Sequence, residues 1–340
     1  MIRQVISIAL LLVSGAAAAA PGDEIYTRPG QLLDAGDGAK LNFTCIGSGS
    51  PTVVFDSGWS DWAPAWAVVQ PRIAEFTRAC SYDRAGAGFS QPGPMPRTTE
   101  RIATELHTAL RNGSIGGPYV LVGSAFGGDH VRAFADLFPK DVAGLVMVDG
   151  DASDVDTPEN RKSDDDGGIS YVPKFRQCRD AIAAGNITYG LPPPPGRPTR
   201  MCAQGFFRGL PDTEWSPELN AKLLDIAQHN LAMWDADISE MEQAPADEIW
   251  LQQHRRTLGS TPVRILTSGN HGVGHLDRPP EPDIEQLKYE YDRAVAQSHW
   301  LTLSTDAKQI FVKGSSEYIQ FDQPDAVVDA VKEVVEIGRR

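Results

Sequence analysis

Positive charge is scarce in this sequence of 340 residues. It holds 31 Lys and Arg residues against 45 Asp and Glu residues, which gives a formal net charge of −14. Nucleic acids and anionic membrane surfaces select proteins with a basic face, so this charge balance argues against both as partners. We expect instead an acidic surface in solution and a small-molecule ligand or substrate.

Sequence patterns for a bound cofactor or metal are also lacking. The glycine-rich segment Asp83–Ser90 is not followed by the G-K-[ST] of a phosphate-binding loop. His271 and His275 have the spacing of metal ligands on a helix, but Gly272 and Gly274 predict a loop there. We therefore expect neither a cofactor nor a metal, and the chain has no internal repeat or coiled-coil pattern.

Cysteine is rare, with four residues that fit two disulfides in an oxidising compartment. Cys178 and Cys202 lie in one irregular region, and we expect them to pair with each other. Cys45 and Cys80 lie on two expected strands and would pair if those strands are neighbours. The alternative for the second pair is two small buried hydrophobic side chains.

The first twenty residues have the pattern of a secretory signal peptide. Arg3 precedes the apolar run Val5–Val13, and small residues follow at Ala16–Ala20. The run is too short to span a membrane comfortably. We expect residues 1–20 to be removed and the remainder to be secreted or periplasmic, without membrane insertion.

Short apolar segments alternate with amphipathic segments along the rest of the chain. This alternation predicts an α/β fold with a doubly wound, mostly parallel sheet. Strands are expected at residues 40–45, 52–55, 79–82, 119–122, 143–148, 262–269 and 309–313. On the helix between the third and fourth of these strands, His107 falls at the edge of the apolar face, and we expect it to be solvated.

The pattern changes between residues 151 and 260, which separates a core of residues 21–150 and 261–340 from an insertion. Asp164–Gly168 and Leu191–Gly196 read as loops, with helical pieces between them, the best over residues 218–233. We expect a helical cap, or lid, over the carboxyl edge of the sheet, where open α/β sheets bind ligands. The aromatic residues of the insertion either line a pocket or form its own small core; they are Tyr171, Phe175, Phe206, Phe207 and Trp234.

The central element is the apolar strand Tyr119–Val122, a glycine-framed turn and then a helix with apolar residues at helical spacing. Strand, tight turn and helix form the setting in which a G-x-S-x-G motif acts as a nucleophile elbow. Here the nucleophile position holds Ala125, which has no lone pair to attack with. Ser124 is one residue too early, because glycines would then be needed at Val122 and Phe126.

Five stretches together carry a specific family resemblance over most of the chain outside the signal peptide and the insertion. The chain resembles exported α/β-hydrolase-fold enzymes related to serine esterases, lactonases and haloperoxidase-like hydrolases. The stretches are Gly47–Val54, Tyr82–Ser90, Val122–Gly128, Leu145–Asp149 and Tyr318–Pro324.

The resemblance implies roles for particular residues. In such enzymes a serine attacks an ester carbonyl, a histidine takes its proton, and a carboxylate, here Asp149, orients the histidine. Backbone N–H groups of Trp59 and Phe126 would form the oxyanion hole. Two positions depart from the pattern: Ala125 replaces the serine, and Glu317 stands where the histidine belongs.

Three interpretations remain open. The first is a descendant of ester or lactone hydrolases that binds a small organic ligand without acyl transfer. The second is a lyase, isomerase or water-activating hydrolase that uses Glu317 and Asp149. The third is an ester or lactone hydrolase inactivated by an engineered substitution, or one that takes its histidine from elsewhere; the candidates are His130, His271 and His275. Replacement of serine by alanine is a usual engineered change, whereas histidine to glutamate is not, and this favours a natural lineage.

Overall fold

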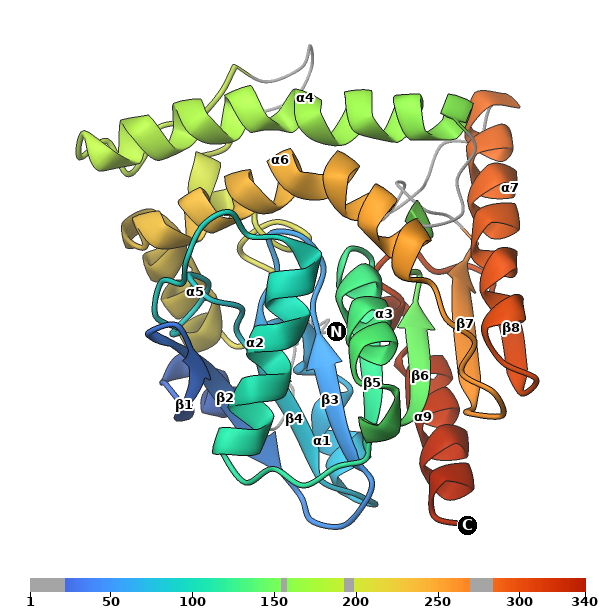
Figure 1. Cartoon of the computed structure of the whole chain (residues 1–340). Coiled ribbons are helices and arrows are strands. Elements are labelled where there is room, and N and C mark those ends of the chain that lie inside the picture. The colour runs from blue at the N-terminus through green and yellow to red at the C-terminus, as the bar shows by residue number, and fades with distance from the viewer. Residues whose placement is uncertain (1–21, 154–157, 193–198, 270–283) are drawn as a thin grey trace, which may run out of the picture.

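The computed structural model describes residues 22–153, 158–192, 199–269 and 284–340, so the expected signal peptide, His271 and His275 lie outside the described residues. Its centre is an eight-stranded sheet of order β1-β2-β4-β3-β5-β6-β7-β8 (Figure 1). β1 and β2 are antiparallel, as are β2 and β4, and all pairs from β4 to β8 are parallel. The strands are β1 Gln31–Gly36, β2 Ala39–Ile46, β3 Thr52–Asp56, β4 Ala79–Tyr82, β5 Tyr119–Ser124, β6 Val142–Val148, β7 Val263–Ser268 and β8 Ala307–Val312.

This sheet confirms the predicted doubly wound, mostly parallel α/β fold. Each of the seven expected strands overlaps an observed one, while β1 was missed. Only part of β1 is buried: Leu33 and Ala35 face the core, while Leu32 and Asp34 are exposed. Such a short edge strand has too few apolar residues to stand out in a sequence.

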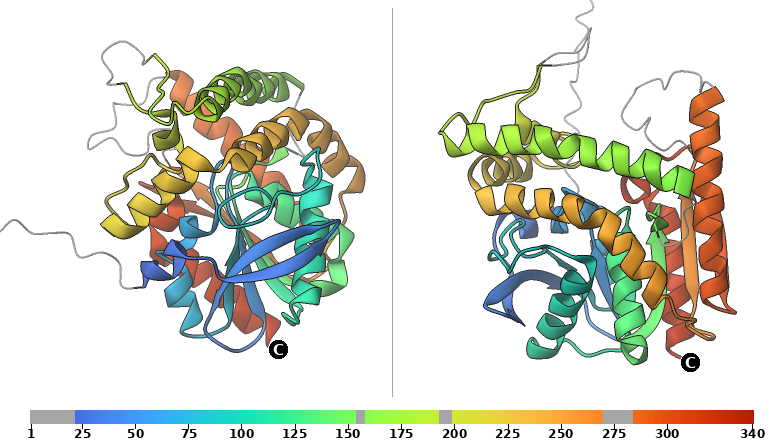
Figure 2. Two further views of the ribbon diagram at one scale, coloured as in Figure 1. Left: turned by 90° about the vertical axis from the view of Figure 1, so that its left-hand side faces the viewer. Right: turned by 45° about the horizontal axis from the view of Figure 1, so that its top comes forward.

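Helices cover both faces of the sheet (Figures 1 and 2). α2 Thr99–Asn112 and α3 Gly127–Leu137 pack on one face, and α1 Gln70–Ala74 and α9 Pro324–Gly338 pack on the other. Successive strand residues alternate between the two cores: Val53 and Phe55 belong to one, and Val54 to the other. The strands are continuous apolar runs because both of their faces are buried. Three further elements complete the carboxyl-terminal part: α7 Ile284–Ser298, η6 His299–Leu303 and α8 Ile319–Asp322.

The segment between β6 and β7 forms helices above the sheet. They are α4 Pro158–Ala183, η5 Cys202–Gly205, α5 Pro217–His229 and α6 Leu231–His254. In Figures 1 and 2, α6 crosses above the carboxyl ends of the parallel strands and α4 lies outside it. This arrangement places helical cover over the edge of the sheet where Ala125 and Asp149 follow their strands.

Two details predicted for this segment are wrong. Asp164–Gly168 was expected to be a loop, but α4 runs through it, because helix packing overrides the weak intrinsic preference of glycine and aspartate. The single helix expected over residues 218–233 is interrupted at Asn230. This residue leaves the helical region (φ −91°, ψ 85°), and its side chain accepts a hydrogen bond from the Met233 N–H, which begins α6.

The expectation that the aromatic residues of the insertion form a separate core is wrong: Phe206, Phe207 and Trp234 belong to the same hydrophobic cluster as strand β3, and 48% of Tyr171 is exposed. Phe206 and Trp234 are buried, with ring centroids 4.8 Å apart. Phe207 packs against Trp62 of the loop after β3, with centroids 4.2 Å apart. The core of the insertion is therefore continuous with the core domain beside the predicted site.

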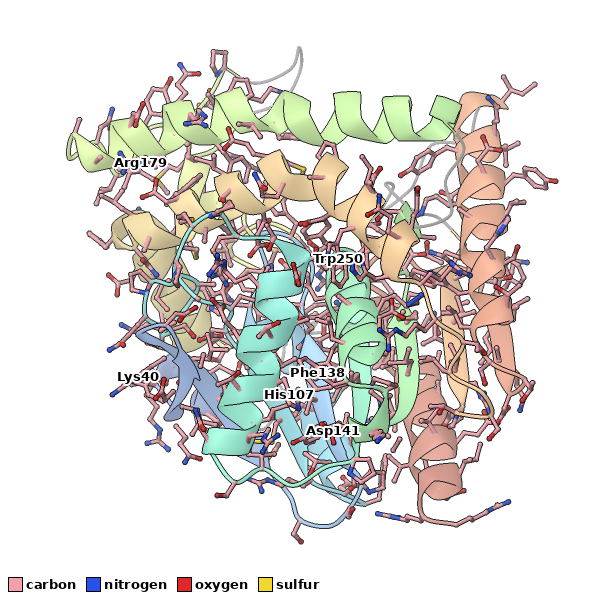
Figure 3. The ribbon with its side chains drawn as sticks, in the orientation of Figure 1. Lys40, His107, Phe138, Asp141, Arg179 and Trp250 are labelled. Atoms are coloured by element: carbon pink, nitrogen blue, oxygen red, sulfur yellow. A yellow bond between two sulfur atoms is a disulfide. The ribbon has the colours of Figure 1, made fainter. Side chains whose placement is uncertain are left out.

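The expectation that His107 is solvated is wrong. Only 9% of this residue of α2 is exposed, because its ring stacks on Phe138 with centroids 3.7 Å apart. His107 Nε2 lies 2.8 Å from Asp141 Oδ2. Figure 3 labels His107, Phe138 and Asp141, which lie next to one another. Helix periodicity placed His107 at an edge that the turn after α3 covers in the folded protein.

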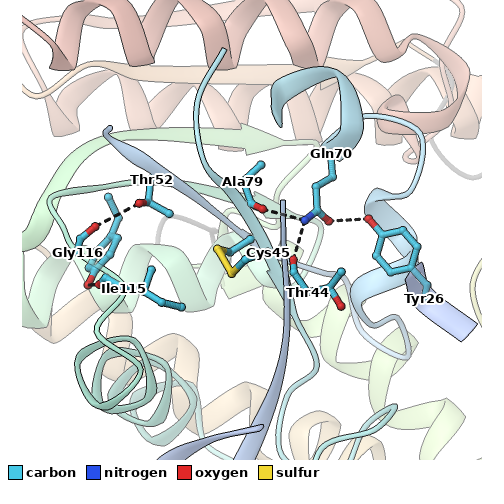
Figure 4. Close-up of a disulfide and its surroundings, with 10 residues drawn as sticks. Tyr26, Thr44, Cys45, Thr52, Gln70, Ala79, Ile115 and Gly116 are labelled. Atoms are coloured by element: carbon cyan, nitrogen blue, oxygen red, sulfur yellow. Dashed lines mark hydrogen bonds between the residues drawn. A yellow bond between two sulfur atoms is a disulfide. The ribbon is translucent and has the colours of Figure 1, made fainter. Parts of the chain in front are cut away.

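Two disulfides are present. Cys178 is bonded to Cys202, as predicted, and Cys45 is bonded to Cys80, its direct partner in the pairing of β2 with β4 (Figure 4). The alternative of two unbonded cysteines at the second pair is wrong. Beside this bond, the Gln70 amide donates hydrogen bonds to the carbonyls of Thr44 and Ala79 at 2.7 and 3.0 Å. Two disulfides are compatible with a secreted or periplasmic protein. Among the described residues, no helix has the length and apolar character needed to cross a membrane.

Removal of the Cys178–Cys202 bond should loosen the cap. The two residues are 24 positions apart. A closed loop of this length restricts the unfolded chain enough to stabilise the fold by about 3 kcal/mol in the chain-entropy treatment. We expect the double substitution Cys178→Ser and Cys202→Ser to lower the free energy of unfolding by about that amount, measured by urea denaturation. An unchanged midpoint and slope would contradict this.

Candidate functional site

Ala125 occupies the tip of a sharp turn between β5 and α3. Its φ of 45° lies in the left-handed region that non-glycine residues rarely adopt. Hydrogen bonds hold the turn: the Ala125 N–H donates to Val148 O at 3.2 Å, and its carbonyl accepts from Gly128 and Asp151 at 2.9 and 3.1 Å. Ala125 is half-buried, whereas Ser124 is buried within β5. The tip of the turn therefore presents a methyl group.

The two glycines that frame this turn are needed for close backbone approach. A Cβ atom added to Gly127 would lie 2.5 Å from Ser57 O and 2.6 Å from Asp56 O. A Cβ atom added to Gly123 would lie 2.4 Å from Gly127 O. Glycine is thus required at both positions, and the turn is pressed directly against the loop that follows β3.

The loop after β3 runs beside Ala125. A Cβ atom built on Gly58 would lie 3.5 Å from Ala125 Cβ and 3.4 Å from Asp61 Oδ2. The Ala125 methyl group and the Asp61 carboxyl group therefore both lie next to Gly58. Among the hydrogen bonds of the described residues, none uses the backbone N–H of Trp59 or Phe126. These two groups, predicted as oxyanion donors, are available to a ligand.

Arg84 holds this loop in place and links it to the cap. Its guanidinium donates to the carbonyls of Ser57 and Gly58 at 2.7 and 2.9 Å. It also pairs with Asp56 and with Glu240 of α6, each at 3.0 Å, and only 3% of Arg84 is exposed. Sequence reasoning gave Arg84 no role, although it lies in one of the stretches that carry the family resemblance.

Trp59 provides a second link between the loop and the cap. Its indole N–H donates to the carbonyl of Asp237 in α6 at 2.9 Å, and its ring packs against Phe175 of α4 with centroids 4.5 Å apart. Trp59 thus joins the loop after β3 to two helices of the cap, α4 and α6.

His130 lies one turn into α3 and pairs with a buried carboxylate. Its Nδ1 is 3.3 Å from Asp56 Oδ1, and its ring meets Phe126 edge-on with centroids 5.1 Å apart. Burial raises the pKa of Asp56, but the charges of His130 and Arg84 outweigh burial and hold this pKa below its usual value. His130 is thereby part of the network that anchors the end of β3.

Glu317 is half-buried in the loop after β8, and its negative charge acts on a second carboxyl group, that of Asp61. Burial, and next the negative charge of Glu317, raise the pKa of Asp61 to about 8. Asp61 is 4% exposed and is hydrogen-bonded to Tyr318, while its Oδ1 has no partner among the described residues. Asp61 was not predicted as a site residue. The only feature of the sequence that could have indicated it is an acidic residue between two tryptophans, Trp59 and Trp62.

Ion pairs fix the loop that carries Glu317 against the cap. The Ser316 N–H and hydroxyl donate to Asp322 Oδ2 at 2.7 and 2.6 Å. Arg208 of the cap lies 3.4 Å from Asp322, pairs with Asp212 at 2.7 Å, and packs over the Phe321 ring. The position of Glu317 is thus set jointly by the sheet and the cap.

Asp149 ends β6 with a φ of 45° and is fully buried. Its carboxylate accepts hydrogen bonds from the Ser268 N–H and hydroxyl at 3.1 and 2.7 Å and from the Gln297 amide at 3.0 Å. Arg293 of α7 approaches it to 3.3 Å. These partners orient Asp149 from β7 and α7.

Within the described residues, no group of three or more His, Cys, Asp and Glu side chains is arranged to hold a metal ion. An open apolar cavity of about 450 Å³ lies elsewhere on the cap. Leu210, Trp215 and Leu224 contribute to its lining, and none of the predicted site residues does.

Comparisons with known proteins agree with this architecture. The family model of the alpha/beta hydrolase fold matches residues 51–185. An AB hydrolase superfamily protein from Gibberella zeae is 21% identical over 310 residues, which cover 85% of this chain and 87% of that protein. The 2-hydroxy-6-oxo-2,4-heptadienoate hydrolase of Pseudomonas putida is 32% identical over 123 residues, 35% of this chain and 44% of that enzyme.

The chain spans only 29%, 37% and 41% of the length of three uncharacterised curated relatives, from Schizosaccharomyces pombe and Bacillus subtilis. Among solved structures, Cfl2 from Burkholderia cenocepacia superimposes with a TM-score of 0.63 at 18% identity, over 89% of this chain and 94% of that one. At that identity the likeness shows a shared fold.

Proposed function

We propose that this chain, which belongs to the α/β-hydrolase-fold family, binds a small organic ligand at the turn beneath its cap, without acyl transfer. The observation that carries the proposal is the methyl group of Ala125 at the tip where serine hydrolases present their nucleophile. A methyl group cannot attack a carbonyl, so no acyl-enzyme forms at this position.

The surroundings of Ala125 support a ligand site inherited from an ester or lactone hydrolase. The backbone N–H groups of Trp59 and Phe126 are free to bind an oxygen atom, and Asp149 is held at the end of its strand. Glu317 occupies the position of the histidine. Loss of both reactive side chains with retention of the scaffold fits a lineage that abandoned acyl transfer. With two disulfides and the expected signal peptide, we place this protein outside the cytoplasm, secreted or periplasmic.

Hydrolysis of a panel of aryl esters and lactones tests this function. The four proteins to compare are the chain as given, Ala125→Ser, Glu317→His, and the double variant. We expect turnover only by the double variant, because a serine without its general base is a weak nucleophile. Addition of Glu317→His to Ala125→Ser should raise kcat/KM by about 10²- to 10⁴-fold, the usual contribution of a positioned general base.

Unfolding midpoints of all four proteins serve as the control for folding. Turnover by the chain as given, unimproved by the double substitution, would refute the ligand-binding proposal.

That refuting result would instead favour the second candidate, a lyase, isomerase or water-activating hydrolase. The carboxyl pair Asp61 and Glu317 supports this candidate, because the pKa of Asp61 is raised to about 8, which lets Asp61 serve as a general acid beside Glu317. With Asp149, Glu317 would then act on water or on a substrate C–H group. Glu317→Gln should abolish such activity, while Glu242→Gln at an exposed position on α6 should leave it unchanged.

A further inference from the structure

The open cavity on the cap shares no lining residue with the predicted site at Ala125. Its volume of about 450 Å³ is within the range of cavities that hold small organic molecules. Its walls come from α5 and from the loop that precedes this helix, and most of the lining side chains are apolar: Leu210, Pro211, Pro217, Ala221 and Leu224. The other three lining residues, Asp212, Trp215 and Asn220, decide which polar groups a ligand would meet.

The Asp212 carboxylate is engaged inside the protein. Its Oδ2 accepts a hydrogen bond from Nε of Arg208 at 2.7 Å, and its Oδ1 accepts from Nη2 of Arg208 and from the Glu214 N–H, both at 2.8 Å. Only 8% of the Arg208 side chain and 5% of the Asp212 side chain are exposed. Because the guanidinium offsets the carboxylate charge at such close contact, a ligand in the cavity meets no unpaired charge from this pair.

The Asn220 amide is engaged in the same way. Its oxygen accepts a hydrogen bond from the Asp212 N–H at 2.7 Å. Its nitrogen donates to the carbonyls of Asp212, Trp215 and Ser216 at 2.8, 3.2 and 3.1 Å. An amide nitrogen has two N–H donors, and three acceptors surround them here. Asn220 therefore fastens the loop to α5 and has no donor left for a ligand.

Trp215 differs from these two residues, because its indole N–H is not used. Nε1 is buried and has no hydrogen-bond partner within the part of the chain that the structure describes, and only 4% of Trp215 is exposed. The ring packs edge to face against Phe207 and Phe321, with centroids 4.9 and 5.7 Å away, so it is not free to turn towards another acceptor. A buried N–H without an acceptor is costly, and in native proteins such groups are usually completed by a ligand or by water.

We propose that this cavity binds a small, uncharged and largely apolar molecule whose carbonyl or ether oxygen accepts a hydrogen bond from the indole N–H of Trp215. The apolar walls supply the affinity, because they remove the hydrocarbon part of the ligand from water. The unused donor supplies the selectivity, because a ligand without an acceptor leaves it unpaired. A charged ligand is disfavoured, since it would lose its hydration and find Asp212 and Asn220 already engaged. The cavity is a second site, and its ligand is independent of the one bound at Ala125.

Indole N–H signals in the NMR spectrum of the full folded protein test this assignment. The chain has seven tryptophans, and the signal that Trp215→Phe removes is that of Trp215. The probes are acetophenone, ethylbenzene, which has a similar shape but no acceptor, and benzoate, which is charged; ligand-detected NMR measures their affinities. We expect acetophenone to shift the Trp215 signal and ethylbenzene to bind about three- to tenfold more weakly, the effect of one hydrogen bond left unmade. Benzoate should not bind.

Three variants assign the binding to the cavity. Trp215→Phe keeps an aromatic ring without the donor, and it should make the affinities for acetophenone and ethylbenzene equal. Trp250→Phe makes the same change on α6 outside the cavity lining and should leave the difference unchanged. Ala221→Phe adds a ring at an exposed position of the wall, so it should fill the cavity and weaken both compounds by at least about tenfold. Unfolding midpoints show whether each variant is folded, and Ala221→Phe still decides the matter if Trp215→Phe does not fold.

Several results would overturn the inference. They are a Trp215 signal that none of the three compounds moves, equal affinities of the unaltered chain for acetophenone and ethylbenzene, and tightest binding of benzoate. Acetophenone binding that persists unchanged in Ala221→Phe would place the ligand at another site and would also overturn it. The hydrolysis panel is independent of these outcomes: failure at the cavity leaves the proposed function at Ala125 intact, and ester turnover by the unaltered chain leaves the cavity site intact.

Discussion

Alanine at Gly127 is expected to destabilise the protein by about 3 kcal/mol or more, whereas alanine at Gly116 should not. At Gly127 the new Cβ would meet two carbonyl oxygens of the loop after β3 at 2.5 and 2.6 Å. Backbone atoms cannot rotate away as a flexible side chain can, so the turn at Ala125 and the loop after β3 must move apart. We therefore expect a loss of stability at the upper end of the range that is usual for overpacking.

Gly116 is the matched control because no heavy atom lies within 4 Å of its added Cβ, and its backbone is not in the left-handed region. Gly116→Ala should leave stability unchanged or raise it by about 0.4–1 kcal/mol through the unfolded chain. Urea denaturation of both variants measures the difference. Equal stability of the two variants would show that the elbow and the loop are not in close contact.

Substitution of Arg84 by methionine is expected to lower the free energy of unfolding by about 3–5 kcal/mol. The change leaves Glu240 as a buried charge without its arginine partner, leaves Asp56 with only His130 and Tyr82, and removes the donors to the Ser57 and Gly58 carbonyls. Methionine fills similar space, so the loss of charge and hydrogen bonds dominates over the loss of packing.

The control for Arg84 is an exposed ion pair of the same chemistry. Arg72 pairs with Asp325 at the surface, with 40% and 83% of the side chains exposed. Arg72→Met should cost no more than about 1 kcal/mol, because solvent screens such pairs. If Arg84→Met costs as little as Arg72→Met, the network that joins the loop after β3 to α6 does not hold the cap. In the variant with both Ala125→Ser and Glu317→His, Arg84→Met should also lower esterase activity, since it frees the loop that bears Trp59, the proposed oxyanion donor.

The core strands were predictable because parallel strands covered on both faces are continuous apolar runs, as at Thr52–Asp56 and Tyr119–Ser124. The turn at Ala125 was predictable because backbone contact requires glycine at positions 123 and 127, whatever lies elsewhere in the chain. By contrast, β1 and the course of α4 depend on packing against neighbours, and neither leaves a strong local pattern.

The predicted site residues were found from local motifs. No motif in the sequence around Asp61 or Arg84 indicates the contacts that these two residues make. Their importance comes from partners that are 156 to 256 positions away, Glu240 for Arg84 and Glu317 for Asp61. His107 illustrates the same limit, because its burial depends on stacking against Phe138 and pairing with Asp141 rather than on its place in α2.

The amino-acid sequence by itself determined the α/β class, the turn at Ala125 and the identity of the groups at positions 125 and 317. Buried strands and tight turns depend on residues that lie next to one another in the sequence, so they leave a local pattern. Only the tertiary structure decided which charges meet. The cap and the loops after β3 and β8 bury Asp61 and Asp237 and let negative charges from other elements act on them, and burial together with these charges raises the pKa of both carboxyl groups above the value in the extended chain.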